Sequence, residues 1–493
     1  MAQVQRFAAH FSGYASYHMA RKPTSVVKNV LNQNCTNLVP DEGVNITGIE
    51  NTWCSWSPFD GDNADVLLGS LDSAFLFSYA FGMYLMGSLG ERINVRYFLS
   101  IGMMFSGIFS FLFGMAYWTN IHSLAYFIIV QVLAGLFQST GWPGCVAAVG
   151  NWFGKSKRGL IMGIWRSHHS IGNIAGSLIA GAFVEYSWGL SFAVPAVIIF
   201  SLGLLTFTFL VPDPRAVGCP VPVHNIDEST PSEQEIIATE DGNKKKDDDS
   251  DSNSIKKESL SSLSSESSTN SDSISSNKED EKAISFWRAV QIPGVMEYSF
   301  SLFFTKLINY TFLYWLPKYL KDSSDTLGSQ DAANLSILFD IGGIFGGILA
   351  GLLSDLTGMS AFTCAGYFIL TIPSLFVYRE YGGVSAGLNI FPLVSGGFSW
   401  LTDRTLSSLR PCRLIWAHIP SLKAPLVTAI IDGTGSIGAA VGPLIAGALS
   451  DLENGWDYLF YALMVASALG LLLLTRLMIN EAKAKCKKKN NDD

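Results

Sequence analysis

Two blocks of sequence occur twice in this chain at nearly the same spacing, and this repeat limits the fold more than any other feature. Residues 170–185 read SIGNIAGSLIAGAFVE and residues 436–451 read SIGAAVGPLIAGALSD, 266 positions further on. Residues 71–91 and 335–355 form a second pair, 264 positions apart, with shared glycines and a final acidic residue. Two colinear repeats at nearly one offset predict a chain built from two duplicated halves.

Each half is rich in apolar runs that are long enough to cross a bilayer. Only 15% of the 493 residues are charged and the mean hydropathy is +0.28, whereas a soluble domain carries about 25% charged residues. A membrane-spanning helix needs about 20 apolar residues. The runs that qualify are 66–88, 97–118, 123–150, 159–184, 189–211, 296–317, 334–353, 359–378, 426–449 and 456–478. With a first span at 6–28, which charge interrupts, and a short one near 385–399, this pattern predicts an all-α membrane protein of twelve spans.

The duplication divides these spans into two six-helix bundles. A segment between them, 224–282, lacks apolar periodicity and is rich in Ser, Asp and Lys, a composition typical of disorder. It is predicted to be either a plain solubilising linker or a target of phosphorylation. The predicted parts are a first bundle at 1–211 with a loop at 29–64, a linker at 212–285, a second bundle at 286–480 and a tail at 481–493.

Charges in the short loops predict the orientation in the membrane. Lys and Arg gather near 91–96, at 155–158 and in the tail at 483–489, and all three groups fall on one side when twelve spans are counted. Positive residues favour the cytoplasmic side. Both termini and the linker are therefore expected in the cytoplasm.

The loop at 29–64 is then expected on the lumenal or external side. It carries glycosylation sequons at Asn34 and Asn45, which agree with that orientation. It also contains Cys35 and Cys54, which either form a disulfide in this oxidising compartment or remain unpaired.

Ionisable side chains inside the spans are the first candidates for a function, because a charge in hydrocarbon costs about 3 kcal/mol or more. Arg21 and Lys22 lie within the first span, toward its non-cytoplasmic side. Either they have a function there, or the span ends at Met19 and both side chains reach the interface. Asp340 and Asp432 are carboxylates in predicted spans eight and eleven, where they act either as gate residues or in helix packing.

The sequence contains no metal-ligand spacing, phosphate-binding glycine loop or nucleophile constellation. The protein is therefore expected to be no enzyme, to use no metal or cofactor, and to bind no nucleic acid. Its oligomeric state does not follow from the sequence.

Five stretches carry a family resemblance. They are YASYHMARKP (14–23), QSTGWPGCVAAVGNWFGKSKRG (138–159), WRSHHSIGN (165–173), NYTFLYWLPKYL (309–320) and TAIIDGTGSIGAA (428–440). They resemble the organophosphate:phosphate antiporters of the major facilitator superfamily, and among these the eukaryotic sugar-phosphate exchangers. The resemblance implies the twelve-helix major facilitator fold with pseudo-two-fold symmetry. It also implies exchange of a sugar phosphate for inorganic phosphate by alternating access, with the endoplasmic reticulum as the compartment.

The resemblance implies that one arginine from each half grips the phosphate. Arg21 matches the first of these arginines, and Lys22, Tyr14 and Tyr17 also fall at family positions. In the second half Asn309 stands where bacterial relatives have the other arginine. Two further candidates are histidines: His169, which is expected to face the cavity, and His168, which is either a coupling residue or a buried core residue.

Lys306 lies three residues before Asn309 on the same helix face and is expected to supply the missing charge. A lysine is a point charge, whereas arginine forms a bidentate fork, so the grip on phosphate would be looser. When the site is empty, either Asp340 or Asp432 is expected to pair with Lys306.

Residues 397–425 depart from the family pattern, with three arginines and three prolines where an apolar helix end is expected. This pattern indicates an altered reading frame or exon and a truncated or altered tenth span. Two alternatives to sugar-phosphate exchange follow from the sequence. One is a proton-coupled organic-anion transporter that uses Asp340 or Asp432, and the other is a membrane receptor or scaffold without transport.

Overall fold

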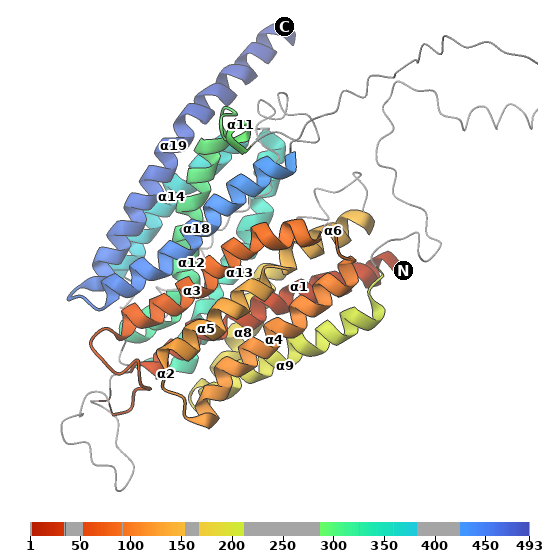
Figure 1. Ribbon diagram of the computed structural model, residues 1–493. Helices are drawn as coiled ribbons and strands as arrows, with labels where there is room; N and C mark the ends of the chain where they lie inside the picture. The colour runs from red at the N-terminus through yellow and green to blue at the C-terminus, as the bar shows by residue number, and fades with distance from the viewer. Residues whose placement is uncertain are drawn as a thin grey trace, which may run out of the picture. The chain divides into compact units, whose positions relative to one another are not determined.

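The computed structural model describes residues 2–33, 35, 53–90, 92–152, 167–211, 286–324, 326–357, 359–381 and 424–492. Within these residues the regular structure is helical (Figure 1). The first half contains α1 (Ala2–Arg21), α2 (Pro23–Leu31), α3 (Ala64–Gly90), α4 (Val95–Thr119), α5 (Leu124–Gln138), α6 (Gly141–Trp152), α8 (His168–Val184) and α9 (Trp188–Phe209). The second half contains α11 (Phe286–Val290), α12 (Val295–Asp322), α13 (Ser329–Thr357), α14 (Ser360–Tyr381), α18 (Ala424–Ser450) and α19 (Gly455–Asp492).

The helices confirm the prediction of an all-α membrane protein. Eight of the described helical segments are long and apolar enough to cross a membrane. The first predicted span appears as α1 followed by α2, and the fourth as α5 followed by α6. The linker at 212–285, the short tenth span and the sequons at Asn34 and Asn45 lie outside the described residues.

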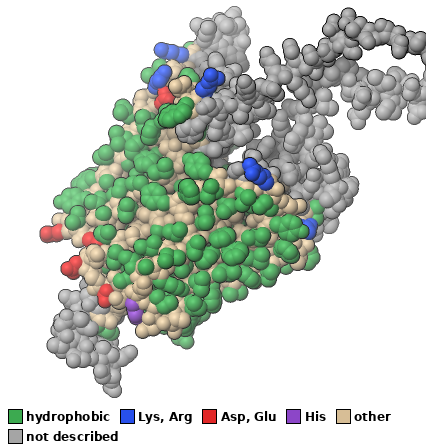
Figure 2. Space-filling model, in the orientation of Figure 1, with side chains coloured by type: hydrophobic (Ala, Val, Ile, Leu, Met, Phe, Trp, Pro, Cys, Tyr) green, Lys and Arg blue, Asp and Glu red, His purple; other side chains and the backbone are tan. Residues whose placement is uncertain are grey.

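Surface charge separates the two ends of the helical unit. We call the end that carries both chain termini the terminal end, and the opposite end, near the start of α3, the loop end (Figure 1). On the face in Figure 2, the Lys and Arg side chains lie at the terminal end, most of the Asp and Glu side chains lie at the loop end, and apolar side chains cover much of the surface between them. This is the distribution expected of a membrane-spanning unit whose terminal end faces the cytoplasm.

The repeated blocks are the helices that join the two halves. Helix α3 packs against α18, and its repeat counterpart α13 packs against α8. At the first joint a side chain on Gly69 would lie 2.9 Å from the carbonyl oxygen of Pro443, and one on Gly447 would lie 2.4 Å from that of Asp65. At the second joint the counterpart of Gly447, Gly181, lies against Ala333. Small residues recur in both blocks because they let the helix backbones touch.

A proline divides the first span. Pro23 lacks a backbone amide, so α1 ends at Arg21 and α2 begins at Pro23. Arg21 and Lys22 are only 6% and 3% exposed, so the alternative in which the span ends at Met19 is wrong. Helix α2 continues to Leu31, ten residues or about 15 Å beyond Arg21, so Arg21 lies inside the first span rather than at its end.

The structure decides one alternative that the sequence left open and corrects one predicted segment. Cys35 and Cys54, which the sequence left open, form a disulfide. The segment predicted as a tail after residue 480 continues α19 as far as Asp492. Its Glu481 is 6% exposed and accepts a hydrogen bond from the backbone amide of Ala361 at 3.0 Å, so this carboxylate caps the first turn of α14.

Candidate functional site

Arg21 is a buried cation within the first span. Its guanidinium carbon lies 5.5 Å from the ring centre of Tyr310 on α12. Its Nε and Nη2 atoms are buried and have no hydrogen-bond partner among the described residues. Buried guanidinium donors are nearly always satisfied, so these atoms are available to an anionic ligand.

Tyrosines connect Arg21 to the second half. Tyr79 on α3 interacts electrostatically with Arg21, with Tyr310 and with the Lys306–Asp432 pair. Both Tyr79 and Tyr310 are half-buried. The sequence did not lead us to these two tyrosines. A tyrosine within an apolar span could have indicated a site residue, because its hydroxyl needs a polar partner.

Lys306 is neutralised by Asp432. The Lys306 Nζ donates to Asp432 Oδ1 at 2.8 Å and approaches Ser436 Oγ at 3.4 Å, joining α12 to α18. The two side chains are 10% and 27% exposed, so the pair remains accessible at mid-membrane. Of the two carboxylates expected to pair with Lys306, Asp432 does so. Asn309, three residues later, is fully buried.

Asp340 has a different position. Its Oδ1 accepts a hydrogen bond from Asn173 Nδ2 at 2.9 Å, which joins α13 to α8 across the two halves. The side chain is fully buried and interacts electrostatically with Lys22. Asp340 therefore lies at a joint between the halves.

Lys22 is held by the backbone of α12 in this conformation. Pro317, in the WLP stretch, has no amide to donate to the carbonyl four residues earlier, which is that of Leu313. The Lys22 Nζ donates a hydrogen bond to this carbonyl at 2.8 Å. The family position of Lys22 suggested phosphate binding, whereas here the ammonium joins the first half to the second.

A buried ion pair that the sequence analysis did not consider lies beyond Lys22. Lys28 on α2 pairs with Asp72 on α3, and both side chains are completely buried. The Lys28 Nζ also donates to the Tyr314 carbonyl at 3.2 Å and lies 3.9 Å from the centre of the Trp315 ring. A cation over an indole face is favourable, so α12 covers the pair. The sequence feature that could have revealed this pair is a lysine in the first span followed by an aspartate in the second.

Three of the remaining predicted site residues, Tyr14, His168 and His169, belong to an aromatic cluster between α1, α6 and α8. The ring of Tyr14 lies 4.4 Å from that of His168, and the ring of His169 lies 4.0 Å from that of His18. His168 is buried, and His169 is half-buried.

Tyr17 points elsewhere. Its hydroxyl is 3.0 Å from Thr140 Oγ1 and 3.5 Å from the Leu99 carbonyl. We therefore interpret Tyr17 as a packing residue of the first half, and Tyr14, which interacts electrostatically with Arg21, as the nearer candidate for ligand binding.

The site is closed toward the loop end. Lys318 Nζ on α12 lies 3.3 Å from Asp65 Oδ1 at the start of α3, and 3.5 Å from Asp322 Oδ2. Asn29 Nδ2 donates to the Pro317 carbonyl at 3.4 Å. These contacts join the halves between Arg21 and the loop end.

Comparisons with known proteins agree on one family. The sequence profile described as the Major Facilitator Superfamily matches residues 53–409. The chain is 46% identical over 482 residues to the glucose-6-phosphate exchanger SLC37A2 of Xenopus laevis, covering 97% of this chain and 92% of that protein. It is 45% identical over 477 residues to the Homo sapiens protein of the same name, covering 96% and 91%. It is 44% identical over 492 residues to a protein of Arabidopsis thaliana named as a candidate glycerol-3-phosphate transporter, covering 96% and 87%.

A solved structure has the same fold at low sequence identity. It is the crystal structure of a bacterial homolog of the human lysosomal transporter Spinster, in an inward-facing and unoccupied conformation. The match covers 98% of this chain and 95% of that chain, with a TM-score of 0.57 and 13% identity.

Proposed function

This chain belongs to the major facilitator superfamily and, within it, to the sugar-phosphate exchangers, and we propose that it exchanges a sugar phosphate for inorganic phosphate by alternating access. The twelve-helix fold expected from the motifs is confirmed by the profile match and by the structural neighbour. In such folds the substrate site lies between the two halves at mid-membrane. We propose no covalent step.

The observation that carries the proposal is Arg21. Its guanidinium is buried within the first span, its Nε and Nη2 have no hydrogen-bond partner in the part of the chain that the structure describes, and it lies near the ring of Tyr310 in the second half. A guanidinium is the side chain best suited to bind phosphate oxygens through two parallel hydrogen bonds. We propose that Arg21 receives the phosphate group and that Lys306 approaches it from the second half.

The ion pairs suggest why transport is an exchange. In this conformation Asp432 neutralises Lys306, and the Leu313 carbonyl holds Lys22. A phosphate dianion at Arg21 attracts Lys306 and repels Asp432, and in doing so draws α12 toward α1. An empty site keeps the unbalanced charge of Arg21, and moving that charge through a low-dielectric core is costly. Reorientation is therefore faster with phosphate or its ester bound.

The test uses purified protein in liposomes loaded with phosphate. Wild-type protein should take up labelled glucose 6-phosphate only when phosphate is inside. Arg21→Lys keeps the charge but loses the fork, and Arg21→Ala loses both, so exchange should fall by at least about ten-fold in both. Full exchange by Arg21→Ala would show that Arg21 is not the phosphate ligand.

A proton-coupled organic-anion transporter remains the second candidate, because Asp340 is a fully buried carboxylate at a joint between the halves. It predicts uptake driven by a pH gradient in liposomes that contain no phosphate. The liposome experiment therefore separates the two functions.

We propose that the protein resides in the endoplasmic reticulum, with its terminal end in the cytoplasm and Asn34 and Asn45 glycosylated in the lumen. The disulfide between Cys35 and Cys54 supports an oxidising compartment for this loop. Sensitivity of the glycans to endoglycosidase H, and its loss in an Asn34→Gln/Asn45→Gln variant, would test both assignments.

A further inference from the structure

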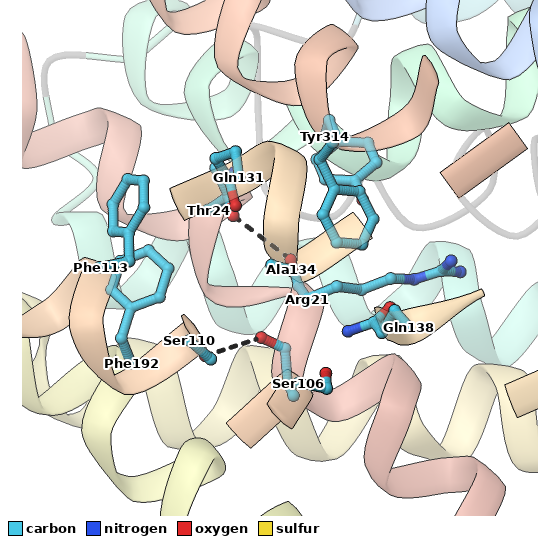
Figure 3. A pocket seen from close by; sticks show the side chains of 12 residues that line it. Arg21, Thr24, Ser106, Ser110, Phe113, Gln131, Ala134, Gln138, Phe192 and Tyr314 are labelled. Carbon is cyan, nitrogen blue, oxygen red and sulfur yellow. Dashed lines mark hydrogen bonds between the residues drawn. The ribbon is translucent and has the colours of Figure 1, made fainter. Parts of the chain in front are cut away.

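A small cavity lies beside the stem of Arg21. Its volume is about 20 Å³, which is sufficient for one water molecule. Its walls come from the helices of the first half, and Tyr314 of α12 contributes the wall from the opposite half. In Figure 3 the Arg21 side chain runs between Tyr314 and Gln138.

The polar groups of this cavity are more numerous than the protein can satisfy. The hydroxyls of Thr24 and Ser110 donate to backbone carbonyls at 3.4 Å. In contrast, Ser106 Oγ and the Tyr314 hydroxyl are buried and have no hydrogen-bond partner among the described residues. The same holds for Nε and Nη2 of Arg21. Unpaired buried polar groups are rare in folded proteins, and several around one cavity indicate a polar occupant.

The remaining wall is aromatic. The rings of Phe113 and Phe192 pack against each other with centroids 4.4 Å apart, and both line the cavity together with Phe75. Hydroxyl and amide groups beside aromatic rings form the kind of mixed surface that suits a polyol, which has O–H groups and apolar C–H faces. The cavity contains no second cation besides Arg21 among its lining residues, so it does not suit a second phosphate.

We infer that this cavity is the subsite for a hydroxyl group of the organic part of the transported ester. Arg21 holds the phosphate on one side, while Ser106 and Gln131 receive the hydroxyl on the other. Inorganic phosphate has no hydroxyalkyl group and leaves the cavity unused. Because Tyr314 belongs to the opposite half, the cavity changes size when the halves move. The inference rests on the proposed function and names the residues that distinguish the two exchanged substrates.

The test compares Ser106→Ala and Gln131→Leu with Ser100→Ala. Ser100 is a matched control, because it is fully buried on the same helix and its hydroxyl donates to Tyr97 outside the cavity. Each variant is reconstituted in phosphate-loaded liposomes, and the KM is measured for labelled phosphate and for glucose 6-phosphate.

We expect the KM for glucose 6-phosphate to rise by about three- to ten-fold in Ser106→Ala and Gln131→Leu, the effect of one lost hydrogen bond. The KM for phosphate should stay within about two-fold of wild type, since phosphate uses Arg21 alone on this side. Ser100→Ala should match wild type for both substrates. Deoxy analogues of glucose 6-phosphate identify the hydroxyl, because the correct analogue has the same KM in wild type and in Ser106→Ala.

Equal changes for phosphate and ester, or no change for either, would overturn the subsite. Ser106→Ala keeps this test decisive even if Gln131→Leu fails to fold, because the Ser106 hydroxyl has no hydrogen-bond partner among the described residues and its removal should leave the thermal stability unchanged. Failure of the wild-type protein to exchange phosphate would instead overturn the proposed function itself.

Discussion

Glu185 and Asp451 make the same contact at the two joints between the halves. Glu185 accepts a hydrogen bond from the backbone amide of Gln330, and Asp451 accepts one from that of Val66, both at 3.2 Å. The two acids close the repeated blocks 266 positions apart, and Val66 and Gln330 are separated by 264, the offset of the second repeat. Each carboxylate lies at the first turn of a helix of the opposite half, where free amides favour an anion. Corresponding residues of the two duplicated halves therefore make equivalent contacts.

These contacts predict a symmetric effect on closure at the loop end. Glu185→Gln and Asp451→Asn should each weaken closure slightly and to a similar extent, since both acids are solvent-exposed and such contacts contribute about 1 kcal/mol or less. A cysteine in place of Ser73, which lies buried between α3 and α18, reports the opening.

The measurement is the labelling rate of that cysteine by an impermeant maleimide added from the loop end. It should rise about two-fold in each single variant and more in the double variant. Faster labelling in only one of the two would contradict the equivalence of the joints.

The buried pair of Lys28 and Asp72 predicts a strong effect on stability. Lys28→Ala leaves Asp72 buried without its cation, which costs about 3–5 kcal/mol. Replacing both residues, in Lys28→Met/Asp72→Leu, removes the charge and should recover most of the lost stability. The melting temperature of the purified protein in detergent measures both effects. A double variant as unstable as Lys28→Ala would show that shape rather than charge holds this region together.

The contact between Lys22 and the Leu313 carbonyl predicts that substitutions at Lys22 and at Pro317, which lie far apart in the sequence, depend on each other in their effect. Pro317→Ala supplies an amide to that carbonyl, which then competes with Lys22. Lys22→Met removes the other partner. The two changes should therefore be non-additive in their effect on phosphate exchange. The exchange rates of the two single variants and the double variant measure this coupling. Additive effects would mean that Lys22 acts elsewhere, for instance directly on the substrate.

The pair of Lys306 and Asp432 predicts a defect that a second substitution relieves. Lys306→Ala leaves Asp432 as a free anion beside the phosphate path, so the KM for phosphate should rise by at least about ten-fold. Asp432→Asn in that background removes the repulsion and should restore part of the affinity.

An arginine introduced at Asn309 in the Lys306→Ala background should also restore part of the phosphate binding, because it returns a cation to the same helix. Phosphate uptake into liposomes measures both rescues. Failure of both would place the phosphate away from α12.

Much of the fold was predictable because it rests on local and repeated patterns. Apolar runs of bilayer length define the spans, and the repeated small residues such as Gly181 and Gly447 mark the helices that touch across the halves. Arg21 was also predictable, since a charge within an apolar run is itself a signal.

The partners of the charged residues were not predictable. The sequence left Asp340 and Asp432 as equal partners for Lys306, and the structure decides between them: Asp432 on α18 pairs with Lys306, whereas Asp340 on α13 accepts a hydrogen bond from Asn173 on α8. Lys22 has the charge of a phosphate ligand, yet its acceptor is a carbonyl freed by Pro317, 295 positions along the chain.

By itself, the sequence determined the helical, membrane-spanning architecture, the duplication and the presence of an arginine within the first span, since each depends on composition and periodicity along the chain. Only the tertiary structure decided which charges neutralise one another and which remain available. The pairs Lys28–Asp72 and Lys306–Asp432 depend on distances between helices far apart in the chain, as does the lack of a partner for Arg21 Nε and Nη2 among the residues that the structure describes. Electrostatic energy in a low-dielectric interior depends strongly on those distances, and no pattern within a single helix contains them.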